Sequence, residues 1–244
     1  MSERLQKLIA TAGYGSRRWA ERLIEQGRIE VNNKTASIGD KCEISDKVKI
    51  DGRKIDLQRY AEEETKVLIL NKQAGVICSN KDEEGRKSVY DLLPKESRWV
   101  MVGRLDLNTS GLLLFTNNGN LANKLMHPSS EIDREYAVRV LGKVEDVHIK
   151  ELTTGIELED GFAKFHRVTL GGGEGANRWY HVIVREGRKR EVRRLWEALE
   201  FKVSRLIRTR FGDIRLPDDL RANQSEYLKP KQVQSLLNSV NLKA

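Results

Sequence analysis

The chain has few of the residues that build metal centres or disulfide frameworks. Its 244 residues include two cysteines and four histidines. Cys42 and Cys78 lie too far apart to form a CxxC motif, so we expect two reduced thiols. No two histidines are four residues apart and none lies beside a cysteine, so we expect no metal site.

Long hydrophobic runs are also missing. No apolar run approaches the about 20 residues that a membrane-spanning helix needs, so we expect no membrane partner. The N-terminal sequence MSERLQKLIATAG carries charge from its third residue and has no apolar signal-peptide core. Together with the reduced thiols, these absences predict a cytoplasmic protein.

Two common catalytic patterns are absent as well. The glycine-rich stretch GGGEG at residues 171–175 lacks the GxxxxGK[ST] pattern of a phosphate-binding loop, and we expect a hairpin loop there. No serine or cysteine lies in a recognisable nucleophile elbow. A nucleophile, if the chain has one, must therefore be another kind of side chain.

Positive charge is abundant, and it is concentrated in one segment. The chain has a net charge of +8, and residues 185–210 hold ten Arg or Lys against four Glu. Most of these cations are arginines, whose guanidinium groups bind phosphate oxygens in a bidentate way. The segment favours a polyanionic partner, although a solvated helix face with internal ion pairs remains the alternative.

The hydrophobic pattern divides the chain into two parts joined by a polar stretch. We expect a small N-terminal domain over residues 1–57, a linker over 58–65 and a larger domain over 66–244. In the first part, residues 3–13 and 16–27 show helical periodicity, and Ser16 and Gly27 are suitable boundaries of the second helix. Hairpins are expected at Asn32-Asn33 and Asp51-Gly52.

The larger part is rich in strands. We expect helices at 119–126, 189–200 and 229–240, and strands at the following ranges: 66–72, 99–106, 112–117, 134–142, 161–170, 178–187 and 201–216. Several antiparallel strands with few helices between them indicate an α+β fold built on a large, mainly antiparallel sheet.

One charged pair lies where a strand is expected to end. In VGRLDLNTSGLLLFTNNG, residues 102–119, Arg104 and Asp106 follow the apolar segment 99–102. Residues two apart in extended backbone point the same way, so the guanidinium group could pair with the carboxylate and keep it ionised. A salt bridge that only holds a loop would explain the pair equally well.

Three segments together resemble a known family. GRLDLNTSGLLLFTNNG at 103–119, REYAVRV at 134–140 and EGRKREVRRL at 186–195 resemble the three motifs of RsuA-class pseudouridine synthases, which act on ribosomal RNA. Residues 3–50 resemble the S4-type RNA-binding domain that precedes the catalytic domain in many of these enzymes. The sequence 114–140 is most similar to members that act on large-subunit, 23S, ribosomal RNA.

The resemblance implies an isomerisation of uridine to pseudouridine. It identifies Asp106 as the nucleophile, with Arg104 and Arg193 expected to pair with its carboxylate. It places Tyr136 against the target base, where the ring stacks and the phenol assists removal of the C5 proton. The reaction has no net redox change or hydrolysis, so neither cofactor nor metal is expected, and the family suggests a monomer.

The target base must leave its stack before it can react, so the protein must hold the RNA on both sides of it. We expect RNA contacts from cationic side chains near the site and on the N-terminal domain, and from the turn after Asp106. These residues are Arg4, Lys7, Arg17, Arg18, Arg22, Asn108, Thr109, Arg188, Lys189, Arg190 and Arg194.

Two other functions fit parts of this pattern. A non-catalytic RNA-binding or ribosome-assembly protein would use the same basic surface, but it would not need the set Arg104, Asp106, Tyr136 and Arg193. A synthase for a different ribosomal RNA site would share all the motifs.

Overall fold

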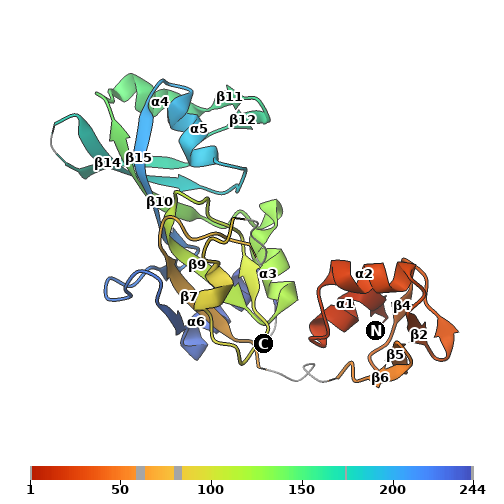
Figure 1. The fold of residues 1–244 in the computed structure, drawn as a ribbon. Helices are drawn as coiled ribbons and strands as arrows, with labels where there is room; N and C mark the ends of the chain where they lie inside the picture. The colour runs from red at the N-terminus through yellow and green to blue at the C-terminus, as the bar shows by residue number, and fades with distance from the viewer. Residues whose placement is uncertain (1, 59–63, 80–83, 174, 243–244) are drawn as a thin grey trace. The chain divides into compact units, whose positions relative to one another are not determined.

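The computed structural model describes residues 2–58, 64–79, 84–173 and 175–242. The chain forms two compact units, Met1–Glu64 and Thr65–Ala244, called here the N-terminal and the C-terminal unit (Figure 1). Most of the expected linker 58–65 lies outside the described residues, so its boundaries stay predictions.

The N-terminal unit packs two helices with short antiparallel strands. A four-stranded sheet has the order β3-β2-β5-β6, and β1 pairs with β4. Ser16 caps the second helix as expected, because its side chain accepts a hydrogen bond from the backbone N–H of Trp19. The elements are β1 (Glu3–Arg4), α1 (Leu5–Thr11), α2 (Arg17–Glu25), β2 (Ile29–Val31), β3 (Lys34–Thr35), β4 (Lys41–Cys42), β5 (Val48–Ile50) and β6 (Arg53–Ile55).

Both expected hairpins of this unit are confirmed. Asn32 and Asn33 link β2 to β3, and both have positive φ angles, which the two-residue turns of twisted hairpins require. Asp51 and Gly52 link β5 to β6 in the same way. The unit buries its own apolar core, which includes Leu5, Ile9, Leu23, Ile24, Ile29 and Val48.

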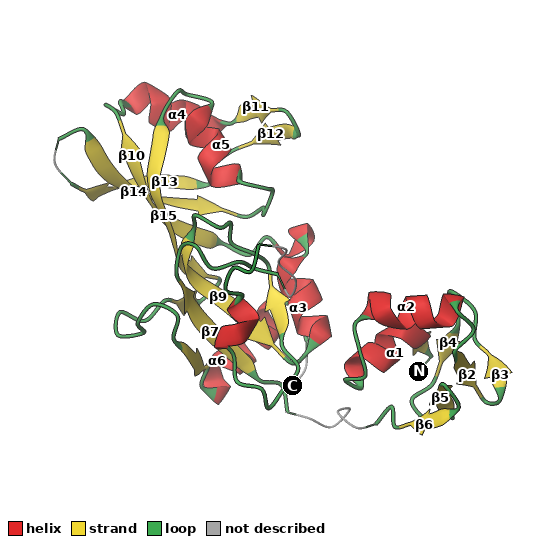
Figure 2. Cartoon of the chain, in the orientation of Figure 1, coloured by secondary structure: helices red, strands yellow, loops and turns green. Residues whose placement is uncertain are grey.

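The C-terminal unit is built on one large sheet (Figure 2). Its elements up to the second motif are β7 (Val67–Lys72), the 3-10 turn η1 (Val89–Leu92), β8 (Val100–Val102), β9 (Ser110–Thr116), α3 (Gly119–Met126), η2 (Pro128–Ser130) and β10 (Arg134–Leu141). The later elements are α4 (Asp146–Thr154), β11 (Ile156–Leu158), β12 (Gly161–Ala163), β13 (Arg167–Gly172), β14 (Asn177–Val184), α5 (Glu191–Glu197), β15 (Lys202–Phe211), β16 (Ile214–Arg215), β17 (Ser225–Tyr227) and α6 (Pro230–Ser239).

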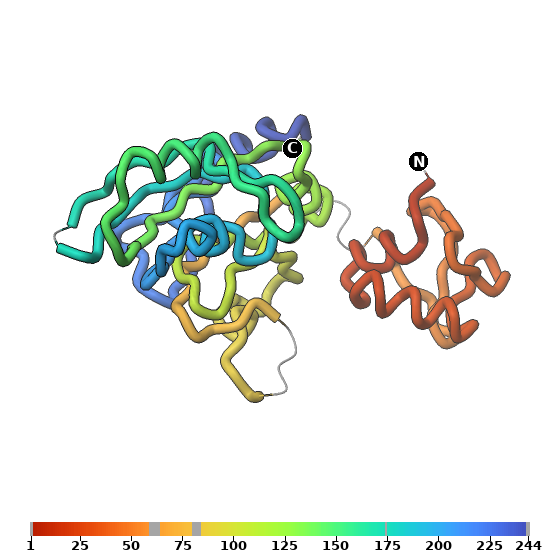
Figure 3. Tube along the Cα trace, turned by 90° about the horizontal axis from the view of Figure 1, so that it is seen from above, coloured from red at the N-terminus to blue at the C-terminus, as the bar shows by residue number. Residues whose placement is uncertain are grey.

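Seven of the nine strands of the sheet follow the order β13-β14-β10-β15-β9-β7-β17. The other two pair with strands inside this order, β8 with β9 and β16 with β15. All pairs are antiparallel except β15 with β9, which confirms the expected, mainly antiparallel α+β fold. The edge hairpin of β13 and β14 projects at one end of the unit (Figure 3). The parallel pair therefore joins two antiparallel halves of the sheet.

Two expected elements differ in the structure, and one helix was not expected. The strand expected at 161–170 is two strands, because β12 pairs with β11 while β13 pairs with β14. The helix expected at 189–200 begins only at Glu191, since Arg190 has a left-handed φ of 54° that a helix cannot include. The helix α4 was not expected, because its mixed polar sequence lacks a strong apolar stripe.

The parallel junction depends on Gly111. This glycine has a φ of +102°, and a Cβ atom there would lie 2.3 Å from the carbonyl oxygen of Arg208 and 2.7 Å from its nitrogen. We predict that Gly111→Ala lowers the free energy of unfolding by about 2–4 kcal/mol, because it adds backbone strain to a steric clash. Chemical denaturation of the full chain measures this loss.

Gly119→Ala is the matched control. Gly119 begins α3, has no positive φ, and has no atom within 4 Å of an added Cβ. Its stability should be unchanged or slightly raised. Equal stability of the two variants would contradict the steric role of Gly111.

Candidate functional site

A cleft of about 760 Å³ opens in the C-terminal unit. One wall is the loop 103–109 between β8 and β9, which contributes Arg104 and Asp106. The segment 186–191 at the start of α5 and Tyr136 from β10 also line the cleft. The cleft thus brings together residues from all three sequence motifs.

A buried lysine holds the 103–109 loop in place. Lys72, at the end of β7, is 0% exposed, and its Nζ donates to the backbone carbonyls of Thr109 at 2.8 Å and Asp106 at 3.2 Å. It also reaches the carbonyls of Gln73 and Leu107 at 3.1 and 3.4 Å. Burial lowers the pKa of this ammonium group, while Cys78 and Asp106 act in the opposite direction. Sequence reasoning missed Lys72; the only signal was a lysine at the end of a mostly apolar strand.

The carboxylate of Asp106 is half-buried and open to the cleft. Within the described part of the chain it forms neither a hydrogen bond nor an ion pair with a side chain. The expected pair with Arg104 is not formed, and the Arg104 side chain is exposed at the cleft wall. The physical reason is the backbone: Gly103 has a φ of +74° and the strand ends before it, so residues 104–106 do not alternate as in a strand.

Arg193 reaches the same loop by a different contact from the one expected. It is 8% exposed, and its two terminal nitrogens donate to the carbonyls of Asn108 and Val203, both at 2.9 Å. Burial lowers the pKa of this guanidinium group, Arg190 lowers it further, and Asp106 opposes both effects. Arg193 therefore clamps the loop to β15 and acts on the Asp106 carboxylate through space, without a direct ion pair.

Tyr136 lies beside two buried arginines. It is 9% exposed, and its cross-strand neighbour on β15 is Arg208, which is 2% exposed. Arg208 donates to the carbonyl of Leu112 at 2.7 Å, and Arg134 donates to carbonyls that include that of Glu186. Neither arginine has a carboxylate within ion-pair distance in the described part of the chain, so both contribute positive charge to the lining of the cleft.

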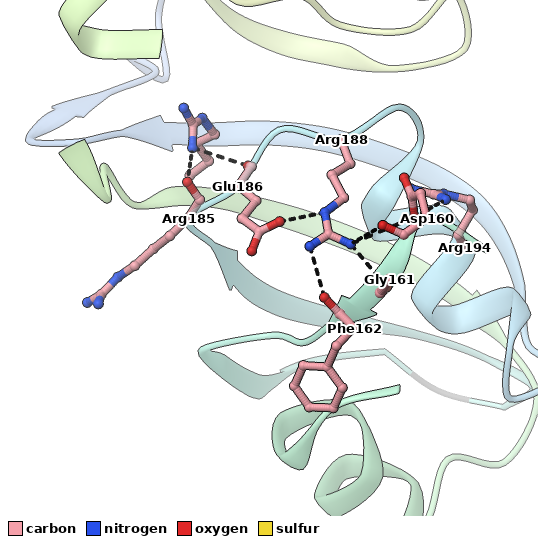
Figure 4. A network of polar contacts seen from close by, with 8 residues as sticks. Asp160, Gly161, Phe162, Arg185, Glu186, Arg188 and Arg194 are labelled. Carbon is pink, nitrogen blue, oxygen red and sulfur yellow. Dashed lines mark hydrogen bonds and ion pairs between the residues drawn. The ribbon is translucent and has the colours of Figure 1, made fainter. Parts of the chain in front are cut away.

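Two of the expected RNA-contacting arginines hold the protein together. Arg194 binds both carboxylate oxygens of Asp160, at 2.7 and 2.9 Å, which lowers the pKa of that acid (Figure 4). Arg188 binds Glu186 and the carbonyls of Gly161 and Phe162. These contacts fix the β11–β12 hairpin against the segment before α5.

The other expected RNA contacts are differently placed. Near the cleft, Lys189, Arg190 and Asn108 are exposed, whereas Thr109 is 2% exposed and its hydroxyl lies inside the protein. On the N-terminal unit, Lys7 pairs with Glu3. The exposed cations of that unit include Arg4, Arg17, Arg18 and Arg22.

The described residues contain no group of three His, Cys, Asp or Glu side chains arranged to hold a metal ion. None of the helices in the described ranges has the length and apolar character that a bilayer span needs.

Comparison with known protein families gives two matches. The model for RNA pseudouridylate synthases matches residues 66–198, and the model for S4 domains matches residues 3–48. The first covers more than half of the chain and includes every cleft residue described above except Arg208.

Individual proteins and one solved structure are also similar. The chain is 54% identical to the ribosomal large subunit pseudouridine synthase B of Escherichia coli strain K12, over 90% of this chain and 77% of that protein. It is 49% identical to the protein of the same name from Haemophilus influenzae, over 99% and 69%. A crystal structure of a pseudouridylate synthase superposes with a TM-score of 0.67 at 26% identity, covering 96% of this chain and 99% of that one.

The position of the 103–109 loop should depend on Lys72. We predict that Lys72→Met lowers the free energy of unfolding by about 1–3 kcal/mol, because the loop carbonyls lose their buried donor. It should also speed amide hydrogen exchange of Thr109, whose N–H donates to the carbonyl of Asp106. Hydrogen exchange followed by mass spectrometry measures both effects.

Lys124→Met is the control. Lys124 also donates to a backbone carbonyl, that of Val240 at 3.0 Å, outside the cleft. Exchange in the 103–109 loop should stay as in the unchanged chain. Faster loop exchange in both variants would mean that Lys72 has no specific role there.

Proposed function

Since the chain belongs to the RNA pseudouridylate synthase family, we propose that it isomerises a specific uridine of 23S ribosomal RNA to pseudouridine. The substrate follows from the relatives, which are named as ribosomal large subunit pseudouridine synthases. The observation that carries the proposal is the Asp106 carboxylate, which is unpaired and open to the same cleft as Tyr136.

The reaction breaks the bond between N1 of uracil and C1′ of ribose and forms a bond between C5 and C1′. The proton on C5 leaves and N1 gains one, so atoms balance without an added reagent. Asp106 acts as the nucleophile, and the absence of a hydrogen-bonded partner leaves its oxygens free for this role. Arg193 stabilises the charge on Asp106 and fixes the loop that carries it.

Tyr136 supplies the surface on which the base rests. Its hydroxyl has no hydrogen-bond partner among the described residues, so it is free to act in removal of the C5 proton. Arg104 is exposed at the cleft wall, and we assign it to the RNA that surrounds the extruded nucleotide. No step needs a cofactor or a metal ion.

RNA binding is shared between the two units. Lys189 and Arg190 are exposed near the cleft, and Arg17, Arg18 and Arg22 are exposed on α2. These cations bind backbone phosphates and position the RNA, while the cleft selects the nucleotide. The protein acts as a monomer in the cytoplasm, where ribosomal RNA is its partner.

A non-catalytic RNA-binding protein would need the basic surfaces but not an unpaired carboxylate in a cleft with Tyr136. A synthase for another ribosomal RNA site remains the second candidate, because the cleft residues do not identify the nucleotide. Mapping pseudouridines in ribosomal RNA with and without the protein separates these functions.

Asp106→Asn should abolish pseudouridine formation, because the amide keeps the shape but is not a nucleophile. RNA affinity should stay within about threefold, since phosphate contacts dominate binding. Tritium release from 5-labelled uridine in ribosomal RNA measures the reaction. Asp146→Asn, on the exposed face of α4, should release tritium normally. Release by the Asp106 variant would exclude the assigned nucleophile.

Replacing Arg17 and Arg18 by alanine should weaken RNA binding and make it less dependent on salt. The slope of log affinity against log salt should become less steep by about 1–2, because the variant makes fewer phosphate contacts and therefore releases fewer counterions from the RNA on binding. Filter binding at several salt concentrations measures the slope. The pair Lys150 and Lys202, which are exposed on the C-terminal unit, is the charge-matched control. An unchanged slope in the arginine variant would rule out this RNA contact.

A further inference from the structure

Glu191 is a buried acid whose role the mechanism above does not use. It begins α5, is 5% exposed and lines the cleft. Among the described residues it is the only Asp or Glu that is buried. One of its carboxyl oxygens, Oε2, is buried and has no hydrogen-bond partner there. A buried polar group without a partner is rare and requires an explanation.

The charged groups around Glu191 do not supply that partner. Burial raises its pKa to about 7 and Glu186 raises it as well, whereas a hydrogen bond from the backbone of Arg188 and the charges of Arg188 and Arg134 lower it. Arg134 is committed to backbone carbonyls, and Arg188 to Glu186 and the β11–β12 hairpin. From the same helix, Arg194 is held by Asp160. Each neighbouring cation therefore already has other acceptors.

We propose that Glu191 binds the imide edge of the extruded uracil and thereby helps to select and hold the base. One carboxyl oxygen accepts the hydrogen bond of N3–H, and the protonated oxygen donates to the adjacent carbonyl of the base. The inference rests on the proposed function, because it needs a uridine in the cleft. It assigns a substrate contact to the first residue of α5.

The chemistry of the isomerisation explains why this edge is suitable. The base must turn so that C5 takes the place of N1, which is a half-turn about the line through N3 and C6. This turn exchanges O2 with O4 and leaves N3–H in place. A carboxyl group that offers one donor and one acceptor can therefore make the same two hydrogen bonds before and after the turn.

The protonation state of Glu191 then sets a pH dependence. Below pH 7 the carboxyl keeps its proton and can donate to the base carbonyl, whereas above it the ionised group can only accept. The reaction step should therefore slow as the pH rises through about 7. A glutamine would keep one donor and one acceptor at every pH.

The first experiment measures single-turnover rates of the full chain on its RNA on both sides of pH 7. Glu191→Gln should match the unchanged chain below pH 7 and exceed it above. Glu191→Ala should lose at least about tenfold in rate, with RNA affinity within about threefold. Glu151→Gln, exposed on α4, should follow the unchanged chain at every pH. A falling rate above pH 7 that persists in Glu191→Gln would overturn the proposal.

The second experiment uses RNA in which the target uridine carries a methyl group on N3. The methyl group should slow the unchanged chain at least about tenfold more than it slows Glu191→Ala, because only the former loses a hydrogen bond. An equal penalty in both proteins would overturn the contact. If the unchanged chain makes no pseudouridine from unmodified RNA, the proposed function itself fails; if it does and the Glu191 variants behave like it, only this inference fails.

Discussion

The arrangement of the cleft depends on one buried ammonium group. Lys72 has no carboxylate partner within ion-pair distance in the described chain, and its charge is balanced by the carbonyl dipoles of the loop that carries Asp106. A carboxylate partner would have neutralised the lysine without ordering that backbone. Three carbonyls of the loop and that of Gln73 converge on this one cation, while Arg193 also holds the loop through the carbonyl of Asn108. The Asp106 side chain is left free as a result.

Other cations that line the cleft are also buried and hydrogen-bonded to backbone carbonyls. Arg134 and Arg208 are buried and satisfy much of their hydrogen bonding with backbone carbonyls, and both contact the ring of Phe211, at 5.3 and 5.5 Å. Guanidinium groups tolerate such burial because they are weakly hydrated and donate in a fixed plane. Their positive charge makes the cleft suitable for a substrate that carries carbonyl and phosphate oxygens, and Glu191 is the only buried acid among the cleft residues that the structure describes.

The basic segment 185–210 combines two functions that its composition cannot separate. Arg188 and Arg194 bind Asp160 and the β11–β12 hairpin, and Arg193 and Arg208 bind loop and strand carbonyls. Only part of the segment, including Lys189 and Arg190, is exposed, and these are the cations that we propose to bind RNA. The alternative of a solvated helix face with internal ion pairs therefore explains only part of the segment, because several of its cations are buried and donate hydrogen bonds to backbone carbonyls.

Local sequence by itself determined the helices of the N-terminal unit, both asparagine and aspartate turns, and the alternating strand that buries Tyr136, because each depends on contacts a few residues apart. The three sequence motifs identified residues that line the cleft. Only the tertiary structure decided what those residues touch: that Arg104 leaves Asp106 unpaired, that Arg193 binds a carbonyl, and that Lys72 lies beneath the loop. The contacts of Lys72 and Arg193 with the 103–109 loop join residues 34 to 85 positions apart, and their geometry follows from strand order and backbone turns that no local pattern encodes.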